Sequence, residues 1–127
     1  MGNARILVVD DEPEILTVLA TRLSMRGYHV TTATNGIAAL EQIRKTAPEL
    51  VLLDVMMPGR SGWEILRELK QDPGTKDIKI VLVSAIGEQA NETAAWQYGA
   101  DGHVDKPFEF NQLEAMIERV LATRPTS

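Results

Sequence analysis

The chain has no cysteine, which excludes disulfide bonds and thiolate metal sites among its 127 residues. This absence fits a reducing compartment, and we expect a cytoplasmic protein. Its apolar runs are far too short to cross a membrane, and Met1–Arg5 is not followed by the apolar stretch of a secretion signal. The formal net charge of −5 argues against direct binding to nucleic acid or to an anionic membrane surface.

The composition is otherwise that of an ordinary globular protein, with a hydrophobic fraction of 44%. The length corresponds to about one domain. We therefore expect a single domain over residues 1–127, with its core at about 4–123 and a polar tail at 124–127.

The most informative stretch is Leu50–Gly59, where four apolar residues lead directly into Asp54. A Pro58-Gly59 turn follows shortly afterwards. A short apolar run bounded in this way predicts a strand that is buried on both faces. Asp54 then lies at the carboxyl end of that strand, where open α/β sheets bind their ligands.

Four further segments predict strands, at Ala4–Val9, Tyr28–Thr32, Ile78–Val83 and Gly102–Val104. The stretches between and after the strands have helical spacing of apolar residues. The helix expected at Glu88–Tyr98 is the weakest, because its inward side is mostly alanine. Five strands alternating with five helices predict an α/β fold, in which helices cover both faces of a parallel sheet.

Polar residues occur where four of these strands end: Asp10 and Asp11, Asp54, Ser84, and Lys106. In a parallel sheet these ends meet at one rim. Three carboxylates at the rim would repel one another, so we expect a divalent cation, and Mg²⁺ suits carboxylate oxygens. A phosphoryl group on Asp54 would be neutralised by the metal, the Lys106 ammonium and the Ser84 hydroxyl. The rim therefore predicts a phosphoryl acceptor.

In their order along the chain, four fragments resemble a response-regulator receiver domain of two-component signalling. They are Leu7–Asp11, Leu53–Gly59, Ser84-Ala85 and Lys106–Phe108. The resemblance extends over nearly the whole chain. It implies a flavodoxin-like doubly wound (βα)5 sandwich with three layers and five parallel strands in the order 2-1-3-4-5.

The resemblance also implies roles for the acidic residues. Asp54 would take a phosphoryl group from the phosphohistidine of a sensor histidine kinase or a phosphotransfer protein. Asp11, Asp54 and the backbone carbonyl of Met56 would bind Mg²⁺ directly. Asp10 would act mainly through a metal-bound water.

For the other strand ends, the resemblance implies that Lys106 contacts the phosphoryl oxygens and precedes a cis peptide bond to Pro107. Ser84 would move toward the phosphoryl group. Receivers usually carry Tyr or Phe three residues before the lysine, as a second switch residue, and this chain has His103 there. The resemblance also implies that a downstream protein, or a second copy of the chain in a homodimer, binds to the face formed by Glu88–Tyr98, the fifth strand and the last helix.

Two apolar residues, Met56 and Ile86, flank the acceptor at positions that influence how fast water removes the phosphoryl group in this family. Their side chains favour a long-lived phosphoryl state.

Two other functions stay open at this point. One is a Mg²⁺-dependent phosphatase with an aspartate nucleophile, although Met56 stands where such enzymes carry a second acid. The other is a constitutive interaction module with the receiver fold. The sequence does not identify the kinase, the target or the oligomeric state, or decide between a single-domain regulator and a piece of a longer protein.

Overall fold

The computed structural model describes residues 4–55, 57, 61–85 and 99–122. All five strands are parallel and form one sheet in the order β2-β1-β3-β4-β5. Their bounds are β1 Arg5–Val9, β2 His29–Ala33, β3 Leu50–Asp54, β4 Lys79–Ala85 and β5 Gly102–Lys106. The predicted α/β class, sheet direction and strand order are confirmed.

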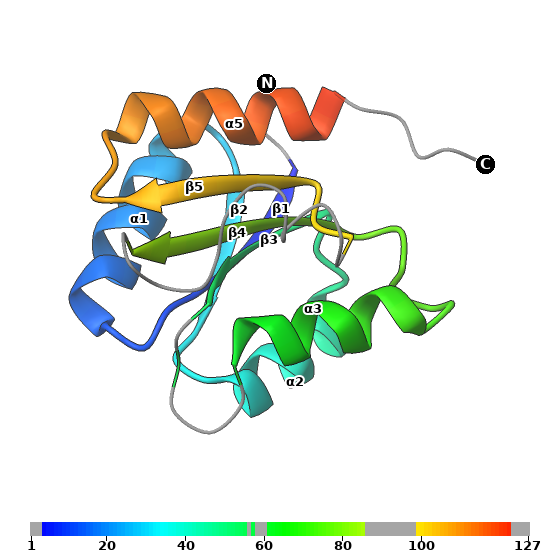
Figure 1. The fold of residues 1–127 in the computed structure, drawn as a ribbon. Coiled ribbons are helices and arrows are strands. Elements are labelled where there is room, and N and C mark those ends of the chain that lie inside the picture. The colour runs from blue at the N-terminus through cyan, green and yellow to red at the C-terminus, as the bar shows by residue number, and fades with distance from the viewer. Residues whose placement is uncertain (1–3, 56, 58–60, 86–98, 123–127) are drawn as a thin grey trace.

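Four helices lie within the part of the chain that the structure describes: α1 Pro13–Met25, α2 Gly36–Thr46, α3 Gly62–Gln71 and α5 Phe110–Ala122. Figure 1 shows α1 and α5 on one face of the sheet and α2 and α3 on the other. The helix predicted at Glu88–Tyr98 lies outside the described residues.

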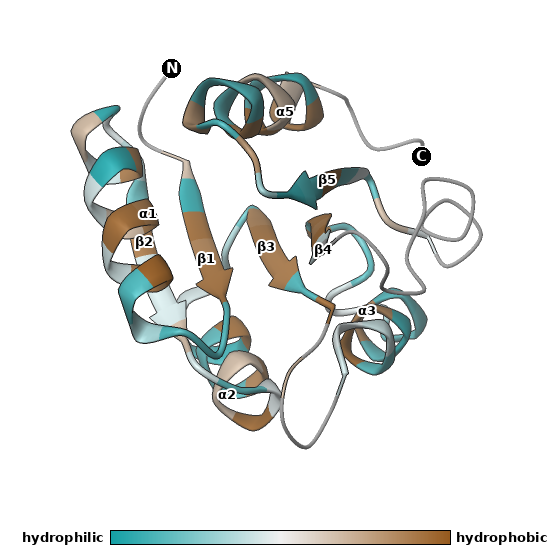
Figure 2. Ribbon diagram, turned by 60° about the vertical axis from the view of Figure 1, so that its left-hand side comes forward, coloured by the Kyte–Doolittle hydropathy of each residue, from teal (hydrophilic) through white to brown (hydrophobic). Residues whose placement is uncertain are grey.

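The central strands are buried on both faces, as their continuous apolar runs predicted. Every residue of β3 is buried, and β1 and β3 appear as hydrophobic ribbons between the helix layers in Figure 2. Alternate strand residues therefore divide between two cores. One core packs against α2 and α3, and the other packs against α1 and α5.

Local signals in the sequence explain several element ends. Pro13 occupies the start of α1, where a missing N–H costs nothing, and Gly27 adopts a φ of 95° just after the helix. The Asn35 side chain accepts a hydrogen bond from the Ala38 amide at 2.8 Å, and Ser61 caps α3 in the same way through the Glu64 amide.

The predicted strand bounds are wrong by one or two residues at several ends. The first strand begins at Arg5 rather than Ala4, and the second is shifted to His29–Ala33. The central strand, expected at Leu50–Leu53, also includes Asp54, and the fourth extends to Ala85. The fifth strand continues through Lys106, because pairing with β4 holds polar residues extended that have no apolar alternation of their own.

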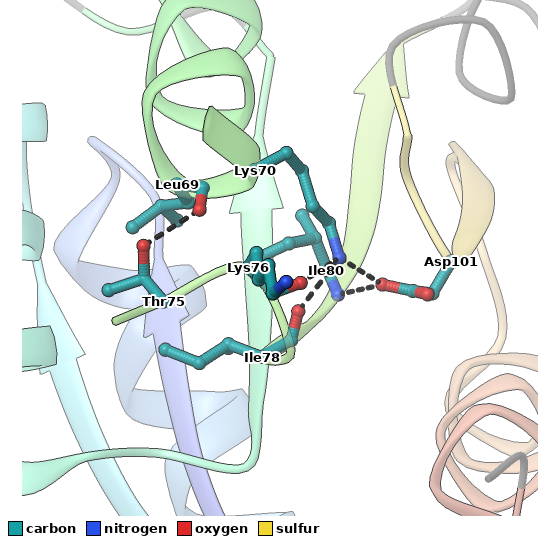
Figure 3. Close-up of polar contacts among 7 residues, drawn as sticks. All are labelled: Leu69, Lys70, Thr75, Lys76, Ile78, Ile80 and Asp101. Carbon is teal, nitrogen blue, oxygen red and sulfur yellow. Dashed lines mark hydrogen bonds and ion pairs between the residues drawn. The ribbon is translucent and has the colours of Figure 1, made fainter. Parts of the chain in front are cut away.

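A polar cluster fastens α3 to the opposite end of the sheet from Asp54 (Figure 3). Lys70 Nζ donates to the carbonyls of Ile78 and Lys76 and lies 3.1 Å from Asp101 Oδ2. The same carboxylate oxygen accepts the Ile80 amide at 2.8 Å. One ammonium therefore joins the end of α3, the start of β4 and the residue before β5.

Charged groups also line the contact between α5 and the end of α1. Arg26 forms an ion pair with the nearly buried Glu114 at 3.1 Å, next to Tyr28, which is 5% exposed. Burial raises the pKa of the Tyr28 hydroxyl, the charges of Glu118 and Glu114 raise it further, and Arg26 lowers it by less.

Candidate functional site

The register of the sheet brings the polar strand ends to one rim. Val9 pairs with Leu53, so Asp10 follows β1 at the level where β3 ends in Asp54. Asp54 pairs with Val83, and the next two residues of β4, Ser84 and Ala85, pair with Asp105 and Lys106. The predicted convergence of Asp10, Asp54, Ser84 and Lys106 is therefore present in the strand pairing.

The centre of the rim is a charged cluster of Asp10, Asp54 and Lys106. Both carboxylate side chains are 5% exposed, and the lysine side chain is 20% exposed. Lys106 Nζ donates to Asp10 Oδ2 at 3.0 Å and lies 3.6 Å from Asp54 Oδ2. One ammonium thus faces two buried carboxylates, and removing it would take a counter-charge away from both of them.

The environment of Lys106 keeps its ammonium charged. Burial lowers its pKa, but the hydrogen bond to Asp10 and the charges of Asp54, Asp10 and Glu12 together outweigh this, so the pKa is raised above the usual value for lysine. Lys106 therefore stays a cation at neutral pH and can bind the oxygens of an arriving phosphoryl group.

Two more carboxylates, Asp11 and Glu12, stand at the mouth of the cluster and are exposed. One carboxylate oxygen from each of Asp10, Asp11 and Glu12 falls within 4.8 Å of the others. Asp10 also shares Lys106 with Asp54, and a group of hard oxygen donors with excess negative charge fits Mg²⁺. Sequence reasoning missed Glu12, although it directly follows the acidic pair and its charge acts on Lys106.

The two oxygens of Asp10 are both engaged by the protein. Oδ1 accepts the Glu12 amide at 2.9 Å, which fixes the turn between β1 and α1. Oδ2 accepts from Lys106. This arrangement holds the carboxylate rigidly beside Asp54.

The predicted switch residues, Ser84 and His103, contact each other directly. Ser84 is fully buried, the His103 side chain is 8% exposed, and Ser84 Oγ lies 2.8 Å from His103 Nε2. The same nitrogen is 3.5 Å from Oδ1 of Asp105, which is mostly exposed. Sequence reasoning placed both residues in the switch but did not foresee this hydrogen bond.

Gly62, the first residue of α3, lies against the backbone of the acceptor. A Cβ atom at this position would meet the carbonyl oxygen of Asp54 and would come within 2.8 Å of the Val55 Cα. The Gly62 amide donates to the Val55 carbonyl at 2.8 Å. The absence of a side chain at Gly62 therefore lets α3 approach closely enough to hold the end of β3.

An apolar groove opens beside the lysine, between α1 and the turn that follows β5. Its volume is about 740 Å³, and its lining residues are Glu14, Ile15, Val18, Leu19, Lys106, Pro107 and Phe108. Val18 is 54% exposed. The Lys106–Pro107 bond is cis, as the resemblance implied. Lys106 contributes both to this groove and to the charged cluster.

Three predictions fall on residues that the structure does not describe: the Met56 carbonyl as a metal ligand, Ile86 at the acceptor, and the output face at Glu88–Tyr98. Trp63, the second residue of α3, is partly buried, and its side chain packs against the core on that face of the sheet. Within the described ranges, none of the helices has the length and apolar character needed to cross a membrane.

Comparison with known proteins agrees with this geometry. The family model of the response regulator receiver domain matches residues 6–118. A probable transcriptional regulator, ycf27, of Pyropia yezoensis is 45% identical over 117 residues, which cover 92% of this chain and 47% of that protein. The phosphate regulon regulator PhoB of Pseudomonas aeruginosa is 42% identical over 121 residues, covering 95% and 53%. The chain thus spans about half the length of these curated relatives.

Solved structures give the same result. A putative response regulator from Chloroflexus aurantiacus superposes with a TM-score of 0.87 at 32% identity, covering 94% of this chain and 98% of that one. The receiver domain of a histidine kinase from Syntrophus aciditrophicus superposes with a TM-score of 0.86 at 28% identity, covering 98% and 96%.

Proposed function

Since this chain belongs to the response regulator receiver domain family, we propose that Asp54 is the residue on which it accepts a phosphoryl group. Receiver domains are phosphoacceptor switches of two-component signalling, and this chain has that role. The observation that carries the assignment is the buried Asp54 carboxylate, with a Lys106 ammonium 3.6 Å away. A nucleophile and a cation that can stabilise the transferred oxygens therefore lie side by side.

The reaction is a transfer from a phosphohistidine. An Asp54 oxygen forms a bond to phosphorus as the phosphorus–nitrogen bond of the donor breaks. The electron pair of that bond stays on the imidazole nitrogen, which takes up a proton. Lys106, held by Asp10, meets the negative charge on the phosphoryl oxygens, and Ser84 offers a hydroxyl proton to one of them.

The reaction requires Mg²⁺ in this proposal. Asp11, Asp54 and the carbonyl of Met56 would hold the ion directly. Asp10 would act through water, which is supported by the engagement of both its oxygens by the protein. Glu12 adds a further carboxylate at the mouth. When bound, Mg²⁺ supplies positive charge that offsets the phosphoryl oxygens.

The protein acts as a regulator rather than as an enzyme with turnover. Phosphorylation shifts an equilibrium between inactive and active conformations. The changed contacts are with a downstream protein or a second copy, through residues 88–98, β5 and α5. The net charge of −5 supports a domain that does not itself bind nucleic acid. The lack of cysteine is consistent with the cytoplasm.

A sensor histidine kinase or phosphotransfer protein supplies the phosphoryl group. This donor protein binds in the groove between α1 and the turn after β5. Lys106 lines the groove and also contacts the acceptor, so a donor seated there presents its histidine to Asp54. Val18, 54% exposed beside Ile15 and Leu19, offers the apolar contact.

Two donors of different size test the acceptor and the groove separately. Acetyl phosphate needs only the charged cluster, whereas a phosphorylated histidine phosphotransfer domain needs the groove as well. Intact mass should show one added phosphoryl group from acetyl phosphate with Mg²⁺, and none on Asp54→Asn. Unchanged labelling of Asp54→Asn, or of wild type without Mg²⁺, contradicts the proposal.

For the groove, Val18→Glu should slow transfer from the phosphotransfer domain while leaving acetyl phosphate labelling unchanged. Met25→Glu is the matched control, because Met25 is also on α1 and is 80% exposed, but it does not line the groove. If Val18→Glu and Met25→Glu slow transfer from the phosphotransfer domain equally, the donor does not bind in the groove.

A further inference from the structure

The contact between Ser84 and His103 joins two strands behind the acceptor. In the register of β4 and β5, Leu82 pairs with His103 and Ser84 pairs with Asp105. All four side chains therefore lie on the same face of the sheet. The 2.8 Å separation of Ser84 Oγ and His103 Nε2 is that of a good hydrogen bond. Both groups are shielded from water, which strengthens the bond.

Only two neutral forms of this hydrogen bond exist. A serine hydroxyl has one proton, and a neutral imidazole has one N–H and one acceptor nitrogen. In the first form Ser84 donates to Nε2, and the imidazole proton is on Nδ1. In the second form Nε2–H donates to Ser84 Oγ. The two forms differ in where the serine proton points.

This difference matters because phosphoryl oxygens only accept hydrogen bonds. In the first form the Ser84 hydroxyl donates its proton to His103, so this proton is not available for a hydrogen bond to the phosphoryl group. In the second form it is free to point at a phosphoryl oxygen. A phenylalanine ring, which receivers often carry at position 103, has no nitrogen through which to make this distinction.

Asp105 biases the choice between the forms. Its Oδ1 is 3.5 Å from the same Nε2, and a carboxylate favours a proton on the nitrogen that faces it. The carboxylate is 67% exposed, so water weakens its pull. The preference for a proton on Nε2 is therefore modest, and the negative charge of a phosphoryl group on Asp54 can add to it.

We propose that His103 is a positioning residue that sets the direction of the Ser84 hydroxyl, donating through Nε2 when a phosphoryl group is on Asp54 and accepting when it is not. This inference rests on the proposed function, because it needs the phosphoryl group at Asp54. It makes the tautomer of one histidine a reporter of the state of the acceptor.

Imidazole ¹⁵N NMR tests the proposal directly, using beryllofluoride with Mg²⁺ as the phosphoryl mimic. An alkaline pH keeps imidazoles neutral, so the spectrum reports the tautomer. The chain has two histidines, and the exposed His29 on β2, at the far edge of the sheet, is the internal control. His103 Nε2 should change from an acceptor to an N–H nitrogen, with His29 unchanged.

The outcomes separate two failures. Amide signals of Val55 and Lys106 report whether beryllofluoride has bound. If they shift while the His103 tautomer does not change, the hydroxyl-direction proposal is wrong and the proposed function stands. If they do not shift, the proposed function is wrong, and the coupling is overturned with it.

A double-mutant cycle gives a second test that does not depend on assigning the tautomer. Ser84→Ala should weaken beryllofluoride binding about tenfold, the value of one hydrogen bond to a charged group. His103→Phe should change the affinity in wild type but not in the Ser84→Ala background. His29→Phe should have no effect in either background. Additive effects of the Ser84 and His103 substitutions contradict the proposal.

Discussion

Replacing Gly62 with alanine should damage both the stability of the fold and the acceptor. In an ordinary helical position this change stabilises a protein by about 0.5–1 kcal/mol, because alanine is less free in the unfolded chain. At Gly62 the new Cβ would meet the Asp54 carbonyl oxygen and lie 2.8 Å from Val55 Cα. These are backbone atoms, which cannot turn away by changing a rotamer.

The clash decides the sign of the effect. Overpacking a rigid site costs about 1–3 kcal/mol, which exceeds the entropic gain. We expect a net loss of about 1–2 kcal/mol, since either α3 or the end of β3 must shift. For a domain of this size each kcal/mol lowers the Tm by about 3–5 °C.

The shift also moves the carboxylate that carries out the chemistry. Small displacements of a reacting group slow a reaction strongly, and we expect acetyl phosphate labelling of Gly62→Ala to fall by about tenfold or more. Thermal unfolding and intact mass spectrometry measure the two effects on the same sample.

Gly74→Ala is the matched control. A Cβ there meets only Asp72 Oδ1 at 3.4 Å, and its stability should stay within about 0.5 kcal/mol of wild type. Wild-type stability of Gly62→Ala would refute the packing argument. A destabilised Gly62→Ala that is labelled at the wild-type rate would refute the positioning argument.

Three further changes test other contacts. Lys70→Met should lower the free energy of unfolding in urea by about 1–3 kcal/mol, because the Lys70 ammonium joins Asp101 to two carbonyls. Lys76→Met, at an exposed position, should leave the free energy of unfolding nearly unchanged, and equal losses in the two variants would contradict this role of Lys70. Asn35→Ala should cost about 1 kcal/mol by removing the cap of α2, and unchanged helicity and stability would show that the cap is dispensable. The raised pKa of Tyr28 means that its contribution to stability is complete below the ordinary tyrosine pKa of about 10 and is lost as pH rises through the folded value. Tyr28→Phe should therefore lose less stability than wild type in the alkaline range, and parallel curves for the two proteins would exclude this linkage.

The central part of the fold was predictable because local and global signals agree there. The apolar run before Asp54 has the composition of a strand covered on both faces, and β3 is buried throughout. Asn35 and Ser61 are of residue types that favour helix starts, and the side chains of both accept a hydrogen bond from an amide in the first turn of their helix. The charged cluster followed from one further rule, that parallel strands end at a common rim.

The parts that were not predictable depend on tertiary contacts. The extension of β5 to Lys106 comes from pairing with β4, since His103 and Asp105 have no strand pattern of their own. The hydrogen bond of His103 to Ser84 depends on the offset between the same two strands. Glu12 was missed because exposed acids next to a helix start are common, and its charge is relevant only where Lys106 is brought near.

The central claim is that Asp54 takes the phosphoryl group, and the most direct test is to locate the modified residue. The protein is incubated with acetyl phosphate and Mg²⁺ and treated with borohydride, which reduces an acyl phosphate to a stable alcohol. Tandem mass spectrometry of the peptides then identifies the altered residue. The account predicts homoserine at position 54 and unmodified Asp10 and Asp11. Modification of either of those two residues, or of none, would contradict it.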